Sequence, residues 1–562
     1  MERIWLKHYP AGVTFDINPD VYTSIVDLFE TAVSRFGKKT ALYHMGSTMT
    51  YKALEKKSRY FASFLQNVLN LKPGDRLAIM LPNTMQYIVS VIGALRAGMT
   101  VVNVNPLYTA RELEHQVNDA QVDTIVVMSN FVETVKTTLP KTRLKHVIVT
   151  EIADLFPQWK SGLINFIARR IKKVAPTFHM PDAILFKKAL KQGARASFQP
   201  VEVCGEDIAF LQYTGGTTGV SKGAKLSHRN MIANVEQAYA WMSQSQIKEG
   251  QEILITALPL YHIFSLMMNG FAFLKVGVKN VLITNPKDIP GLIRELSKHR
   301  FTIFSGVNTL FKALLRHRNF KKLDFSSLKI AIGGGMAVHK QVAADWAALT
   351  GVPLLEAYGL TEASPGVCCN PLGAEKFSGS IGYPFPSTDI KIVDHQGIEL
   401  PVEAVGELCV HGPQVMQGYW NRPQETMDVL TEDGWLRTGD IAKIDAEGQV
   451  FIVDRKKDMI VVSGYNVYPN EVETAIAEHP DVLEVAVIGE PNENTGEVIK
   501  AFVVRKDESL TREKLMAFCR ERLTFYKIPK HYEFCGELPK TNVGKILRRA
   551  LREERFRNKN VQ

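Results

Sequence analysis

One glycine-rich stretch holds the residue types that bind a polyphosphate. It reads YTGGTTGVSKGA from Tyr213 to Ala224 and follows the apolar, strand-like segment IAFLQ. Glycines let backbone N–H groups approach phosphate oxygens, hydroxyls donate hydrogen bonds to them, and a lysine adds a positive charge. We therefore expect phosphate binding by the following residues: Tyr213, Thr214, Gly215, Gly216, Thr217, Thr218, Gly219, Ser221 and Lys222.

This stretch does not fit the Walker A pattern, G-x-x-x-x-G-K-[ST]. Lys222 is followed by Gly223 and not by serine or threonine. A P-loop NTPase is therefore not expected. The alternative is a surface loop that binds nothing, since glycine-rich loops are common. A loop that combines so many hydroxyl groups with a lysine is not common, which favours phosphate binding.

Four further motifs carry residues suited to nucleotide chemistry. YGLTE spans 358–362, TGD spans 438–440, DRKKDMI begins at Asp454, and LPKTNVGKILRR begins at Leu538. They supply an aromatic ring, carboxylates, an arginine and a lysine. The sequence has no G-x-S-x-G nucleophile elbow, so a hydrolase of that type is not expected.

Taken together, these motifs resemble the signatures of the adenylate-forming superfamily of acyl-CoA synthetases, luciferases and peptide-synthetase adenylation domains. Ser221 stands where many members have proline. Residues 433–457, DGWLRTGDIAKIDAEGQVFIVDRKK, are similar to a longer signature of fatty acyl-CoA synthetases, and the bacterial long-chain ligases match best. The resemblance implies that ATP and a long-chain fatty acid form acyl-AMP and pyrophosphate. CoA then gives acyl-CoA and AMP, which would supply fatty acid degradation.

The resemblance also implies a role for individual residues. Lys545 would be the catalytic lysine, a point charge on a long stem that reaches the carboxylate and the α-phosphate. Thr361 would donate to the α-phosphate, while Glu362 and Thr214 would hold Mg²⁺. The residues implied to bind adenosine are Tyr358, Gly359, Asp440 and Arg455.

The acyl site is implied at two places. One is His262 in LPLYHIF, and the other is the run Gly333, Gly334 and Gly335 at the end of a predicted strand, where missing side chains leave room for a ligand. A packed core histidine is an equally good interpretation of His262. Taken alone, Glu362 is typical of an exposed loop glutamate, and Asp440 is typical of a turn.

The hydropathy pattern predicts a large α/β domain followed by a small one. A β-rich subdomain between about 379 and 453 completes the large domain, 1–456, which we expect to hold the ATP and fatty acid sites. The small α+β domain, 457–562, would carry the catalytic lysine and move about a hinge that the resemblance places at Lys457. The expected strands of the α/β part are 76–81, 100–105, 124–129, 146–150, 253–256, 281–284, 301–306 and 329–335.

Composition sets the broad class. The 562 residues are 45% hydrophobic and 22% charged, which excludes collagen, coiled coil and wholesale disorder. Six cysteines without a C-x-x-C pair argue against a disulfide framework and a structural zinc site, and favour a cytoplasmic setting. The net charge of +10 favours anionic ligands without requiring nucleic acid. The first twenty residues do not predict a secretory signal.

Membrane contact is expected to be peripheral, because the apolar runs fall short of the roughly 18–20 residues that span a bilayer. The segment 163–174 predicts an amphipathic helix with four basic residues on one face, ended by Pro176. Such a helix can lie on the anionic inner face of the cytoplasmic membrane. Packing against the large domain is an equally good interpretation.

Three other functions share part of these features. A luciferase-like monooxygenase would oxidise the adenylate, and a carrier-loading adenylation domain would use a protein-bound thiol. A membrane-docked lipid-binding protein without turnover would not need the glycine-rich stretch or Lys545, and both are present. The acyl-chain range and a homodimeric state stay open at this point.

Overall fold

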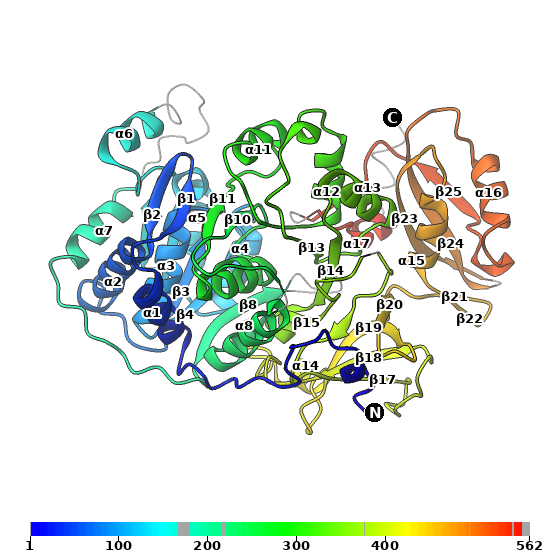
Figure 1. Ribbon diagram of the computed structural model, residues 1–562, viewed down its shortest axis with the longest axis horizontal. Helices are drawn as coiled ribbons and strands as arrows, with labels where there is room; N and C mark the ends of the chain where they lie inside the picture. The colour runs from blue at the N-terminus through cyan, green and yellow to red at the C-terminus, as the bar shows by residue number, and fades with distance from the viewer. Residues whose placement is uncertain are drawn as a thin grey trace.

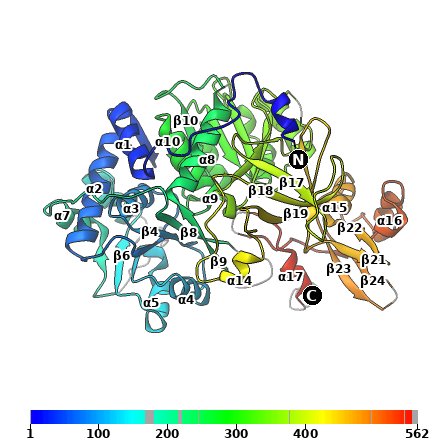
Figure 2. The same cartoon turned by 90° about the horizontal axis from the view of Figure 1, so that it is seen from below.

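The computed structural model describes residues 2–166, 180–214, 221–243, 245–375, 377–493, 495–541 and 544–553. Over these residues the chain forms sheets of nine, seven, five and four strands. Figures 1 and 2 show the seven-stranded sheet and the small C-terminal domain at opposite ends of the long axis. The expected α/β class, with a large N-terminal and a small C-terminal domain, is confirmed.

The seven-stranded sheet carries the strand that leads into the glycine-rich stretch. Its strands are buried, β-branched and nearly all parallel, as expected of a sheet covered on both faces. Strands β8 and β9 are antiparallel and flank the glycine-rich stretch. In sheet order the strands are β7 (Ile184–Leu185), β6 (His146–Thr150), β5 (Thr124–Met128), β3 (Arg76–Met80), β4 (Thr100–Asn103), β8 (Ile208–Thr214) and β9 (Lys222–Ser227).

The nine-stranded sheet has a parallel centre with antiparallel strands at both edges. The predicted runs fall on its strands within about two residues, since β-branched apolar runs are a local signal. In sheet order the strands are β16 (Tyr383–Pro384), β15 (Gly366–Cys369), β14 (Leu354–Gly359), β13 (Ile330–Gly334), β12 (Ile303–Gly306), β10 (Ile253–Thr256), β11 (Lys279–Leu282), β1 (Thr40–His44) and β2 (Ser47–Thr50).

Helices cover these two sheets. Helix α3 (Met85–Arg96) is buried along its whole length because it contacts β3 and β4 of one sheet and β1 of the other. Helix α4 (Ala110–Asp119) begins with a capping box between Thr109 and Glu112. The other long helices are α1 (Ile25–Phe36), α2 (Tyr51–Asn67), α5 (Val132–Thr138), α7 (Phe186–Gly193), α8 (His228–Met242), α11 (Ile289–Leu296), α12 (Asn308–Arg316) and α13 (Lys340–Thr350).

A four-stranded antiparallel sheet forms the predicted β-rich subdomain. It comprises β17 (Asp389–Val393), β18 (Gly406–His411), β19 (Leu436–Ile444) and β20 (Val450–Arg455). A short helix, α14 (Pro423–Met427), lies between β18 and β19 in the chain.

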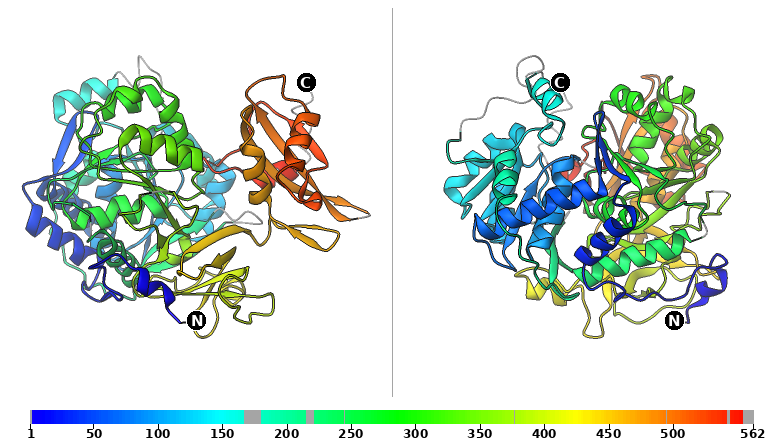
Figure 3. Two further views of the ribbon diagram at one scale, coloured as in Figure 1. Left: turned by 45° about the vertical axis from the view of Figure 1, so that its right-hand side comes forward. Right: turned by 60° about the vertical axis from the view of Figure 1, so that its left-hand side comes forward.

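The small domain has its own sheet and its own core, and Figure 3 shows it set beside the rest of the chain. Strand β24 is the centre of this sheet and pairs with three neighbours. The elements are β21 (Ile460–Val462), β22 (Tyr465–Val467), α15 (Pro469–Ala477), β23 (Val482–Asn492), β24 (Gly496–Arg505), α16 (Arg512–Arg520), β25 (His531–Phe534) and α17 (Arg548–Arg552).

The segment predicted to be amphipathic falls on helix α6, which spans Gln158–Phe166. The rest of the predicted helix, 167–174, lies outside the described residues. Trp159 and Phe166 of α6 are 74% and 57% exposed. Among the described helices, none combines the length and the hydropathy needed to cross a membrane.

Candidate active site

A single cavity of about 1180 Å³ gathers residues from both domains. It lies where the end of β14, the β8–β9 hairpin, the four-stranded sheet and the small domain meet. Residues more than 300 positions apart in the sequence therefore share one wall. The expected site residues that line it are Tyr213, Thr214, Lys222, His262, Gly335, Tyr358, Gly359, Thr361, Glu362, Arg455, Lys457 and Lys545.

A few of the expected residues lie elsewhere. Gly333 and Gly334 do not line the cavity; a Cβ there would meet Val338 at 2.6 Å and Phe264 at 3.0 Å. These two glycines therefore allow close packing around β13. Asp440 does not line the cavity itself but contacts Tyr358 and Arg455, which do. The expected phosphate ligands Gly215, Gly216, Thr217, Thr218 and Gly219 lie outside the described residues.

Tyr358, Asp440 and Arg455 form one group, joined by a hydrogen bond and an ion pair. The Tyr358 hydroxyl donates to Asp440 Oδ2 at 2.5 Å, and Arg455 Nε lies 2.6 Å from Asp440 Oδ1. Asp440 and Arg455 are also opposite one another on β19 and β20, which fixes their spacing. Burial and the Asp440 carboxylate raise the pKa of Tyr358, so its hydroxyl stays a donor. Of this group, Tyr358 and Arg455 line the cavity.

Lys545 enters this cavity from the small domain. Its backbone closes a turn with Thr541, because Thr541 N–H donates to the Lys545 carbonyl at 2.7 Å and Lys545 N–H donates to Thr541 Oγ1 at 3.0 Å. Burial, reinforced by the nearby Arg455 charge, lowers the pKa of the Lys545 amine to about 8. The amine is therefore a cation near neutral pH that has lost much of its hydration.

His262 lines the same cavity, next to an irregular helix. Burial, followed by the Lys545 charge, lowers the pKa of His262 to about 4, so the imidazole is neutral near pH 7. The chain continues into α9 (Ile263–Ser265), a π-helical segment (Leu266–Ala272) and α10 (Phe273–Lys275). The apolar part of the cavity lining comprises Leu258, Ile263, Phe264, Met267, Met268, Val307 and Met336.

Tyr419 is a site residue that the sequence interpretation missed. Its hydroxyl donates to Glu362 Oε1 at 2.6 Å, and the amine of Lys222 lies 5.2 Å from the centre of its ring. Tyr419 thus links the acidic residue of YGLTE to the lysine of the glycine-rich stretch. Aromatic residues in a connecting segment give no local signal for such a contact.

The connection between the domains is anchored to the four-stranded sheet. Strand β20 ends at Arg455 and β21 begins at Ile460. Lys456 N–H donates to the Gly439 carbonyl at 3.0 Å, and its amine lies 2.9 Å from Glu407. Lys457 follows without belonging to a strand and lines the cavity.

Comparison with known proteins defines the class of this chain. The profile of the AMP-binding enzyme family matches residues 29–420, and the profile of the AMP-binding enzyme C-terminal domain matches 471–545. The chain therefore belongs to the AMP-binding enzyme family.

Two relatives that match nearly the whole length of the chain carry the same name. The long-chain-fatty-acid–CoA ligase of Escherichia coli O6:H1 is 55% identical over 99% of this chain and 98% of the relative. The protein of the same name from Haemophilus influenzae is 49% identical over 99% of both.

Solved structures share the fold. ATP-bound MatB from Rhodopseudomonas palustris is 27% identical, with a TM-score of 0.80 over 94% of this chain and 98% of that one. The anthranilate CoA ligase AuaEII, solved with anthranoyl-AMP, is 24% identical with a TM-score of 0.84 over 96% and 99% of the two chains.

Proposed function

We propose that this chain is an AMP-forming long-chain fatty acid–CoA ligase. A fatty acid carboxylate attacks the α-phosphorus of ATP, giving acyl-AMP and pyrophosphate, and the CoA thiol then displaces AMP to give acyl-CoA. The observation that carries this proposal is that Lys545 shares one cavity with Tyr358 and Arg455, both bound to Asp440, and with a wall of apolar side chains. Relatives named for this reaction, 49–55% identical, support it.

Residues of this chain can supply the positive charge and the positioning that the first step requires. Two anions must meet, so the site must supply positive charge and hold the reactants in place. The Lys545 amine would neutralise the carboxylate and the α-phosphate. The ring of Tyr358 would stack on adenine, with Gly359 beside it, and the carboxylate of Asp440 would accept from the ribose hydroxyls, assisted by Arg455. Neutral His262 would border the acyl chain.

Mg²⁺ fits this site as a companion of ATP. Among the described residues no cluster of three His, Cys, Asp or Glu side chains that could hold a metal occurs. Glu362 offers one carboxylate, with hydroxyls at Thr214 and Thr361, and Mg²⁺ is commonly held by one or two carboxylates together with substrate phosphates and waters. The ion would neutralise phosphate charge. Tyr419 would orient Glu362 toward it.

Two further parts of the proposal concern the domains. We place their boundary at 456/457, between the last strand of the four-stranded sheet and the first strand of the small domain's sheet. Lys457 is the proposed hinge, since it lies between strands and next to a residue anchored to the large domain. The small domain would turn so that Lys545 leaves the cavity and the CoA thiol enters.

Membrane contact and self-association complete the proposal. Helix α6 exposes Trp159 and Phe166 and lies at the edge of the molecule in Figure 1. An exposed aromatic pair followed by a basic segment suits the inner face of the cytoplasmic membrane. Co-sedimentation with anionic vesicles tests this contact, and light scattering tests a homodimer.

Pyrophosphate release tests the main proposal. We expect release from palmitate, ATP and Mg²⁺, with palmitoyl-CoA and AMP as products once CoA is present. Acyl-AMP that CoA does not consume would favour a carrier-loading domain, while oxygen-dependent loss of acyl-AMP would favour a monooxygenase. Binding of palmitate without any pyrophosphate would contradict the proposal.

A further inference from the structure

The last turn of helix α4 contacts strand β8 and the residue that precedes strand β9, on the two sides of the glycine-rich stretch. Asp119, the final residue of α4, accepts a hydrogen bond from the Tyr213 hydroxyl on β8, with 2.6 Å between Oη and Oδ2. One turn earlier, His115 Nε2 lies 3.1 Å from the carbonyl oxygen of Ser221, just before β9. Because a carbonyl only accepts, Nε2 carries the hydrogen in this contact. One helix turn thus contacts Tyr213 and Ser221, which lie on the two sides of the central glycines.

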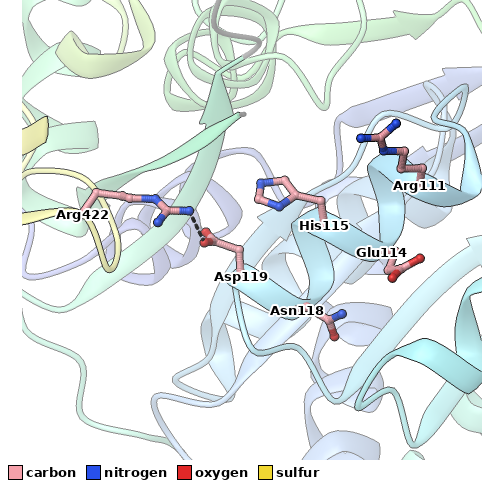
Figure 4. Close-up of a pocket in the computed structure, with 6 residues that line it drawn as sticks. All are labelled: Arg111, Glu114, His115, Asn118, Asp119 and Arg422. Atoms are coloured by element: carbon pink, nitrogen blue, oxygen red, sulfur yellow. Dashed lines mark hydrogen bonds and ion pairs between the residues drawn. The ribbon is translucent and has the colours of Figure 1, made fainter. Parts of the chain in front are cut away.

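Asp119 also binds the segment that runs beside β9. Its Oδ1 accepts from Arg422 Nη2 at 3.1 Å, and its backbone carbonyl accepts from Trp420 Nε1 at 3.1 Å. Figure 4 shows His115 and Asp119 along α4, with Arg422 reaching Asp119 from the opposite side. The Asp119 side chain is only 11% exposed, so water competes little for these hydrogen bonds.

These contacts close a ring around the Tyr213 side chain. Tyr213 pairs with Gly223 across the β8–β9 hairpin, and a Cβ on Gly223 would lie 3.0 Å from the Tyr213 ring. The carbonyl of Gly223 accepts from the backbone N–H of Trp420 at 2.8 Å. The chain of contacts therefore runs from Tyr213 to Asp119, to Trp420, to Gly223 and back to Tyr213. These contacts restrict the orientation of the Tyr213 side chain.

We propose that Asp119 is a positioning residue for ATP binding and for the adenylation half-reaction. It acts through Tyr213 and Arg422 and sets where the two ends of the glycine-rich stretch lie. This inference rests on the proposed function and adds to it a residue that does not line the main cavity. A reactant displaced by about 1 Å can lose on the order of a hundredfold in rate, so a lost anchor should be measurable.

Asp119→Asn is the direct test, because an amide offers only one acceptor oxygen where the carboxylate uses two. We expect the KM for ATP to rise, and the single-turnover rate of acyl-AMP formation to fall, by about tenfold. Consumption of supplied acyl-AMP by CoA should stay within about twofold of wild type. ATP binding without fatty acid, measured by calorimetry, should weaken in parallel.

Tyr213→Phe is the second variant and removes only the hydroxyl that Asp119 accepts from. It should shift the KM for ATP in the same direction by a smaller factor. The double variant should be no worse than Asp119→Asn alone, because both changes break the same contact. If Asp119→Asn does not fold, the KM and calorimetric results for Tyr213→Phe decide the question.

Glu114→Gln is the matched control. Glu114 lies on the same helix and lines a surface pocket together with His115 and Asp119, but its ion-pair partner is Lys141, at 3.8 Å. If Glu114→Gln and wild type both form acyl-AMP with the same KM for ATP, the proposed function is supported independently of the role of Asp119. An unchanged KM for ATP in folded Asp119→Asn, or equal losses in both half-reactions, would overturn the inference while leaving the proposed function intact.

Discussion

Arg548 and Asp454 form an ion pair across the connection between the two domains, with 3.5 Å between Nη1 and Oδ1. Arg548 lies three residues after Lys545, whereas Asp454 lies at the end of the four-stranded sheet. The same guanidinium is 3.3 Å from Asp458 and 2.8 Å from Glu473. One side chain therefore ties the Lys545 turn to the proposed hinge.

Arg548→Met should destabilise the small domain strongly. It removes the cation shared by three carboxylates that are largely or fully buried, and breaking a buried ion pair on one side typically costs about 3–5 kcal/mol. Urea unfolding followed by fluorescence measures the loss. Arg549→Met is the control, since Arg549 is exposed and its ion-pair partner among the described residues is the exposed Glu553. Equal stability of the two variants would show that the cluster is not needed.

Lys545→Ala should abolish most acyl-AMP formation but leave thioester formation from supplied acyl-AMP largely intact, because the charge acts on the first transition state. Loss of one preorganised charge contact typically costs about 3 kcal/mol or more, roughly a hundredfold or greater in rate. Single-turnover rates of the two half-reactions measure this. Equal losses in both would contradict the role proposed for Lys545.

The pH dependence of adenylation should report the same amine. Burial lowers the Lys545 pKa to about 8, and the step needs the protonated form. Below that pH the cation is present, so kcat/KM for acyl-AMP formation should be steady and then fall as the pH rises through about 8. Consumption of supplied acyl-AMP should not decline over this range. A kcat/KM for acyl-AMP formation that stays constant between pH 7 and 9 would show that adenylation does not depend on protonation of the Lys545 amine in this range.

Lys457→Pro should slow transfer to CoA selectively. Proline fixes φ near −65° and restricts the preceding residue, so the connection loses the freedom that a rotation requires. We expect acyl-AMP to form at a near-normal rate and then to persist in the presence of CoA. Lys456→Ala is the control, because it removes an anchor without stiffening the backbone. Normal transfer in a folded Lys457→Pro variant would place the hinge elsewhere.

Acyl chain length should raise catalytic efficiency. Each methylene moved from water into an apolar channel contributes up to about 0.8 kcal/mol, so palmitate has an upper limit of roughly 6 kcal/mol over octanoate. The measurement is kcat/KM for both acids below their micelle concentrations. Equal values would refute the long-chain assignment.

The sequence predicts local features of this chain well. Runs such as 76–81 and 124–129 coincide with β3 and β5, because fully buried parallel strands are nearly continuous in β-branched apolar residues. YGLTE, TGD and DRKK also come together, since each lies in or just after a strand that borders the cavity. The resemblance to adenylate-forming enzymes, and not periodicity, gave these motifs their roles.

Contacts between distant segments were not predictable in this way. Tyr419 meets Glu362 across 57 positions, and Asp119 meets Arg422 across 303. No periodic pattern encodes such pairs. Asp119 did carry one usable signal, because an acidic residue in the last turn of a helix opposes the helix dipole and is locally unfavourable. The π-helical segment at Leu266–Ala272 has no comparable marker.

The placement of Lys545 has a consequence for the order of events. The lysine belongs to the small domain, yet its amine is buried in a cavity that the large domain mostly builds. The turn that carries it also packs closely there, since a Cβ on Gly544 would lie 2.4 Å from Thr309 Oγ1. A ligand that touches the amine therefore favours this arrangement of the domains, and linkage is reciprocal. A cross-link that fixed the arrangement would tighten ATP binding by the same factor by which bound ATP favours formation of that cross-link.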